Sequence, residues 1–167
     1  MHSWTLAVLG AGAAAAFWDL RWRTIPRTLC VLAFGAGLIY HTLTGDLGSA
    51  VAAAGAGFAL GAILFQVGAV GGGDVKWLTA MGALLGWHLW FWSVEFGLIA
   101  AALGAIGQVA LRGRLLFLGQ DVVAIVREWR RHGLRPHPEH NVNTPGAVTA
   151  PLAPALAVGL LCALLWL

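Results

Sequence analysis

Two aspartates stand where they could act together as acids. Asp19 ends one apolar run, and Asp74 follows another directly after three consecutive glycines, Gly71, Gly72 and Gly73. Two carboxylates at close range in a partly desolvated site resist double ionisation, so that one pKa rises and the pair holds a shared proton. The ionised member can activate water while the protonated member polarises a carbonyl group. This chemistry hydrolyses a peptide bond and needs no nucleophilic side chain, metal or cofactor.

The segments beside the two aspartates suit an extended substrate. Three successive glycines permit unusual backbone angles and let another chain lie directly against the backbone. Taken alone, Asp19 could form an interfacial ion pair with Arg21 or Arg23, and the glycines could form an ordinary loop. The combination of the two acids, the glycines and their positions in the chain favours a site.

Other polar residues are weaker candidates for a functional site. Glu95 is expected near the external end of an apolar segment, where its carboxylate can reach the membrane interface. Three histidines, His132, His137 and His140, fall in a proline-containing stretch without cysteines or paired helical spacing. We therefore expect no metal site there.

The composition indicates a membrane protein. Of 167 residues, 59% are hydrophobic and 10% are charged, whereas a soluble domain carries about 25% charged residues. So few charges cannot solvate the surface of a globule, so lipid is expected to face most of the outside. We expect one membrane-embedded domain over 1–167 with no nucleic-acid partner, although the net charge is +3.

Apolar segments predict an all-α polytopic fold with about six transmembrane helices. The expected spans are 2–18, 28–44, 48–70, 77–92, 94–111 and 148–167. As one helix, 77–111 would be about 52 Å long, against a hydrocarbon core of about 30 Å. The chain is therefore predicted to fold back near Gly86-Trp87-His88. Small residues within the spans are expected to serve helix packing; they are Gly55, Gly57, Gly61, Gly104 and Gly107.

Basic residues predict the orientation. All ten lysines and arginines fall in the connections after the first, third and fifth spans. Because positive charge is retained in the cytoplasm, these connections should be cytoplasmic and both termini outside. The ends of the first and third spans would then place both aspartates on the cytoplasmic face. Apolar residues at helical spacing over about 115–131 predict an amphipathic helix lying on that face.

The sequence resembles the type IV prepilin peptidases, membrane aspartic proteases with a GxGD motif. Asp19 precedes a basic segment that runs into Ile25 and Pro26, and the glycines lead through Asp74 into Val75-Lys76, as in that family. The proline-containing start of the last span, 151–156, is also similar. The chain looks like the short form, without a methyltransferase region, and is similar to the peptidases that serve tight-adherence (Flp-type) pili or related archaeal systems.

This resemblance implies an aspartic endopeptidase in the inner membrane that removes the leader of prepilins, with Asp19 and Asp74 as catalytic residues. It also implies that Gly71–Gly73, Lys76, Ile25 and Pro26 form the motif around substrate access. A presenilin-like GxGD protease is an alternative, although Trp18 stands where those proteins have tyrosine. A small ion-coupled transporter or channel and a non-catalytic pilus assembly factor are alternatives of other classes. The oligomeric state is not predicted by any of these features.

Overall fold

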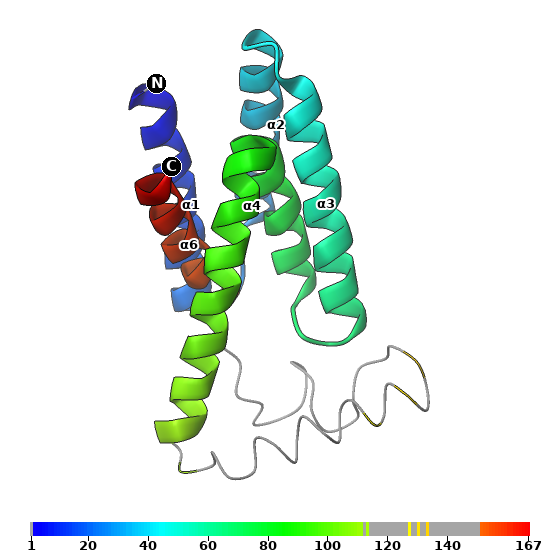
Figure 1. Cartoon of the computed structure of the whole chain (residues 1–167), viewed down its shortest axis with the longest axis vertical. Helices are drawn as coiled ribbons and strands as arrows, with labels where there is room; N and C mark the ends of the chain where they lie inside the picture. The colour runs from blue at the N-terminus through cyan, green and yellow to red at the C-terminus, as the bar shows by residue number, and fades with distance from the viewer. Residues whose placement is uncertain (1, 112, 114–126, 128–129, 131–132, 134–150) are drawn as a thin grey trace.

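The computed structural model describes residues 2–111, 113, 127, 130, 133 and 151–167 (Figure 1). Within this part of the chain the fold is all-helical, with no strand, as the sequence predicts. The helices are α1 (His2–Trp22), α2 (Arg27–Leu43), α3 (Leu47–Gln66), α4 (Gly72–Leu111) and α6 (Leu152–Trp166). The amphipathic helix predicted at about 115–131 and the histidines at 132, 137 and 140 lie outside the described residues.

Apolar helix length supports a membrane protein. Among the described residues, three segments are long and apolar enough to cross a bilayer: Ser3–Trp22, Leu47–Gln66 and Gly72–Leu111. Helices α2 and α6 are apolar but shorter, with 17 and 15 residues. The number of six spans therefore remains a prediction.

Helix α4 is broken at Gly86, which divides it into two helical parts. The backbone there has φ 72° and ψ 173°, a conformation far from helical that is open essentially to glycine alone. Figure 1 shows the chain reversing direction within α4. The turn predicted near Gly86-Trp87-His88 is therefore confirmed, although Trp87 and His88 are already helical.

The first part of α4 packs antiparallel to α3 with almost no side chain between the backbones. A Cβ on Gly57 would lie 2.8 Å from the carbonyl carbon of Leu78, and one on Gly61 would lie 2.9 Å from the Cα of Val75. Gly82 meets the backbone of Ala53 in the same way. The predicted packing role of Gly57 and Gly61 is thus confirmed, because only a missing Cβ permits this approach.

Three other glycines do not have the predicted role. Around Gly55, Gly104 and Gly107 the described structure has no atom within 4 Å of where a Cβ would lie. Within the described residues these three glycines make no close helix contact, so their predicted packing role is not seen in this part of the chain.

The second part of α4 packs against α6, and α6 in turn packs against α1. Gly97 on α4 abuts Leu156, and Gly159 on α6 abuts the backbone of Ser93 and Gly97. On the other side of α6, Leu160 lies against Gly12 of α1. Helix α6 therefore connects the first helix of the bundle to the later part of α4.

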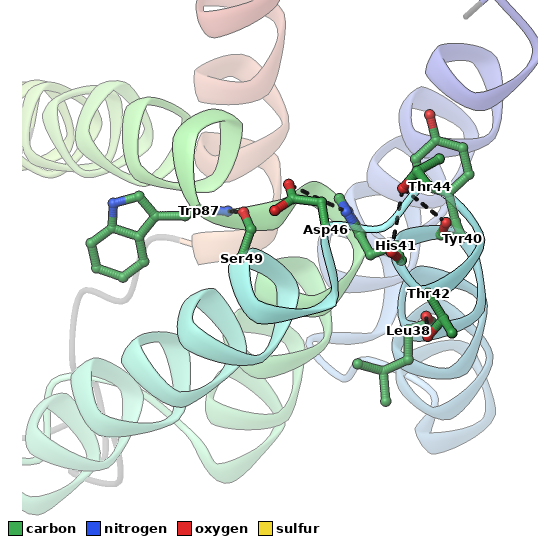
Figure 2. A network of polar contacts seen from close by, with 8 residues as sticks. All are labelled: Leu38, Tyr40, His41, Thr42, Thr44, Asp46, Ser49 and Trp87. Atoms are coloured by element: carbon green, nitrogen blue, oxygen red, sulfur yellow. Dashed lines mark hydrogen bonds and ion pairs between the residues drawn. The ribbon is translucent and has the colours of Figure 1, made fainter.

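A polar network joins the α2–α3 connection to the turn of α4 (Figure 2). The Trp87 backbone N–H donates to the Ser49 hydroxyl oxygen at 2.8 Å, and His41 Nδ1 lies 4.0 Å from a carboxylate oxygen of Asp46. The buried imidazole of His41 also packs against Gly86. These contacts hold the turn at the end of the bundle that both α2 and the first part of α4 reach.

Candidate active site

Asp19 lies in the last turn of α1 and is buried, with 6% of its surface exposed. Its Oδ2 accepts a hydrogen bond of 3.1 Å from the backbone N–H of Ala153, in the first turn of α6. Arg21 does not form the ion pair with Asp19 that the sequence allows; its guanidinium lies over the Trp22 ring, 5.5 Å from the centroid. The buried carboxylate is therefore held by a helix N-terminus on a segment 134 residues away.

Asp74 lies in the first turn of α4. Its Oδ2 accepts a 3.0 Å hydrogen bond from the backbone N–H of Gly71, the residue just before that helix. A carboxylate three residues into a helix commonly reaches back to the cap residue in this way, and the positive end of the helix dipole favours its charge. The sequence Gly71 to Asp74 thus fixes this acid locally.

The two aspartates come together at one end of the bundle. Helix α1 descends to this end, and the chain turns from α3 into α4 there (Figure 1). The carboxylates are close enough to interact electrostatically. In both cases a backbone N–H at a helix N-terminus holds one of the two carboxylate oxygens.

The Ile-Pro segment lies beside the glycine turn. A Cβ on Gly73 would be 4.0 Å from the backbone nitrogen of Ile25, whose side chain is buried. Pro26 precedes α2 and starts it, since its fixed φ suits the beginning of a helix. Lys76 is exposed and lies within electrostatic range of Cys30 on α2.

The three glycines differ from their predicted conformation. Gly72 and Gly73 form the first turn of α4, and none of Gly71, Gly72 and Gly73 has a positive φ. The unusual backbone angles that glycine permits are therefore not used at these three positions, and the positive φ in the α3–α4 connection is at Gly68, with φ 75°. The glycines were also expected to let another chain approach the backbone. At Gly72 there is room for this, since no described atom lies within 4 Å of where its Cβ would be.

A comparison with protein families identifies the scaffold that carries these residues. The model of the type IV leader peptidase family matches residues 6–109. The chain belongs to this family. No curated protein and no solved structure matches the chain.

The type IV leader peptidase match spans α1 to nearly the end of α4 and so includes both aspartates, Ile25, Pro26 and Lys76. Family membership makes the protein a leader-peptidase-like protease of the membrane. Helix α6, which supplies the bond to Asp19, lies beyond the matched residues.

Sequence analysis did not identify Ala153 as part of this arrangement. Its contribution is a backbone N–H, which almost every residue type has, so the side chain gives no signal. The prolines at 151 and 154 indicate the start of a helix, but they do not indicate what that helix meets.

Proposed function

We propose that this leader-peptidase family member is an aspartic endopeptidase that removes the leader of prepilin-like proteins, with Asp19 and Asp74 as its catalytic dyad. The observation that supports this most is the convergence of two carboxylates from α1 and α4 within electrostatic range, at one end of a bundle that belongs to the family.

The two acids supply the chemistry of hydrolysis. The ionised carboxylate takes a proton from water, and the resulting hydroxide attacks the scissile carbonyl carbon. The protonated carboxyl group donates to the carbonyl oxygen. The tetrahedral intermediate then breaks at the C–N bond as the leaving nitrogen takes up a proton.

The segments around the dyad suit an extended leader. The face of Gly72 is open, so a peptide backbone can approach the start of α4 next to Asp74. Ile25 and Pro26 border the same turn, and the exposed ammonium of Lys76 follows half a helical turn later. We assign these residues to substrate access.

The location follows from the distribution of charge. All ten basic residues lie in alternate connections, which by the positive-inside rule puts the dyad at the cytoplasmic face of the inner membrane and both termini outside. The substrate would then present its basic leader on the cytoplasmic side and its hydrophobic helix in the bilayer.

The test is leader removal from a co-expressed prepilin, scored by mass, in membranes matched for protein level. Asp19→Asn and Asp74→Asn each keep size and polarity but remove the ionisable acid. We expect each to lower the cleavage rate by about 10²- to 10⁴-fold, the usual contribution of a positioned acid or base. The double mutant should be little worse than either single mutant, because the two residues act as one unit.

Glu95→Gln is the matched control, since it makes the same change from acid to amide at an exposed position of α4. It should cleave at nearly the wild-type rate. Wild-type cleavage by either aspartate variant would remove that residue from the dyad. Absence of cleavage by the wild-type protein with every prepilin of its host would favour a non-catalytic assembly role.

A further inference from the structure

The start of α6 has a buried backbone donor, the N–H of Ala153, that its own sequence does not satisfy. Pro151 stands at the cap position but makes no side-chain hydrogen bond to the helix. Ala153 is 1% exposed, so bulk water does not reach it. A buried N–H needs a partner, and the Oδ2 of Asp19 is that partner.

Asp19 therefore caps α6 from another helix. Serine, threonine, asparagine or aspartate usually fills this role from the cap position itself. Here proline occupies that position and the carboxylate comes from the last turn of α1. The bond restrains Asp19 as much as it stabilises α6, since it engages one oxygen of a side chain that otherwise rotates about two torsions.

Helix α6 contacts both parts of α4. Gly97 and Gly159 bring it into backbone contact with the second part, which leaves no room for sliding. Leu156 of α6 lines a small cavity together with Trp77 and Met81 of the first part, which carries Asp74. The N–H of Ala153 is thus placed by contacts to α4, and Asp19 is placed by that N–H. Helix α6 therefore fixes the position of Asp19 relative to the helix that carries Asp74.

We propose that the first turn of α6 is a positioning element of the aspartate site, in which the Ala153 N–H orients the Asp19 carboxylate toward Asp74. The inference rests on the proposed function and adds to it a segment outside the residues that match the family. Ala153 is a positioning residue, because it acts only through Asp19.

The test removes one N–H donor. Incorporation of lactic acid in place of Ala153 by nonsense suppression replaces the amide by an ester, which keeps the shape but has no donor. The ester also weakens the preceding carbonyl as an acceptor, a change that the control shares. The same replacement of Ala157, on the next turn of α6, is the matched control, because it deletes an ordinary helix hydrogen bond instead.

For the ester at 153 we expect kcat of leader cleavage to fall by about tenfold or more, as misplacement of a catalytic group does, with KM within about twofold. The ester at 157 should leave both constants close to wild type. A purely structural role would lower the yield of folded enzyme in both ester proteins and leave kcat per folded molecule unchanged. Equal kcat for the two ester proteins, or a change confined to KM, would overturn the proposal.

A second measurement does not depend on activity. In protein labelled with ¹⁵N-alanine, Asp19→Ala should move the amide proton resonance of Ala153 upfield, since it loses a charged acceptor, whereas Asp74→Ala should leave it in place. An unchanged Ala153 resonance in Asp19→Ala would show that the bond is not formed and would also overturn the proposal.

Failure of the positioning role can be distinguished from failure of the proposed function. If Asp19→Asn retains full activity, the dyad assignment fails. If Asp19→Asn is inactive while the ester at 153 has normal kcat, the dyad stands and the positioning role of α6 does not.

Discussion

Two glycines of α3 that stand two residues apart should respond in opposite ways to the same substitution. Gly57 faces the first part of α4, where a Cβ would lie 2.8 Å from the carbonyl carbon of Leu78 and 3.2 Å from the nitrogen of Thr79. Gly55 has no described atom within 4 Å of the equivalent position. Alanine at these two positions therefore adds the same methyl group, once against a helix backbone and once on an open face.

The size of the effect follows from the overlap. The carbonyl oxygen of Leu78 would lie nearer still to this Cβ than the carbonyl carbon does. Ordinary van der Waals contact begins at 3.4 Å, so Gly57→Ala must separate the two backbones by at least about 0.6 Å. Overpacking of a tight interface costs about 1–3 kcal/mol. Gly55→Ala meets no such contact and should stabilise α3 by up to about 1 kcal/mol, because glycine is a poor helix former.

The displacement should also reach the site. Leu78 lies one turn beyond Asp74 on the same helix, so the carboxylate moves with it. A misplacement of 1 Å can reduce a rate by about 10²-fold, so we expect a loss of kcat of about tenfold or more in Gly57→Ala and none in Gly55→Ala.

Thermal unfolding of purified protein in one detergent, together with leader cleavage per folded molecule, measures both effects. The reasoning would be refuted if Gly57→Ala were as stable and as active as Gly55→Ala, because α3 and α4 would then not be in backbone contact.

The remaining predictions concern orientation and the turn of α4. With native cysteines replaced by alanine, Arg21→Cys should react with a membrane-impermeant maleimide only in inside-out vesicles and Gly48→Cys only in intact cells; labelling of both from one side would contradict the proposed topology. Gly86→Ala should lower stability by about 1–3 kcal/mol, because φ 72° with ψ 173° is strained for alanine and its Cβ would lie 2.9 Å from a ring carbon of His41. Gly48→Ala, at an open position on α3, is the control, and equal melting temperatures for these two alanine variants would contradict the strain argument.

The helical fold and the turn in α4 could be predicted because the thickness of a bilayer limits the length of an apolar helix that crosses it. A 35-residue apolar run cannot cross once, which required a turn, and Gly86 was the residue best able to make it. The helix ends were less accurate. Asp19 and Asp74 were expected just beyond their spans, but α1 continues to Trp22 and α4 begins at Gly72. Glycine is a poor helix former, so packing and the Asp74 cap, rather than propensity, decide where α4 begins.

Which face of each helix packs against the bundle could not be predicted, because lipid and protein interior are both apolar. In a soluble protein, polar residues mark the outer face of a helix. Here Gly55 and Gly57 both adjoin Ala56 in the sequence, yet Gly55 faces outward and Gly57 contacts Leu78. The spacing of Gly57 and Gly61 gave the correct packing face, whereas single glycines such as Gly104 gave none.

The way in which the two acids are held has a consequence for their chemistry. A buried carboxylate needs compensation for lost hydration, and a neighbouring arginine is the strongest compensation available. A full positive charge, however, favours the ionised form so strongly that a shared proton would be lost. Asp19 and Asp74 each accept a hydrogen bond from a neutral backbone N–H at a helix N-terminus. Such an N–H orients one carboxylate oxygen without placing a full positive charge beside it, which suits a pair of acids in which one takes a proton while the other gives one.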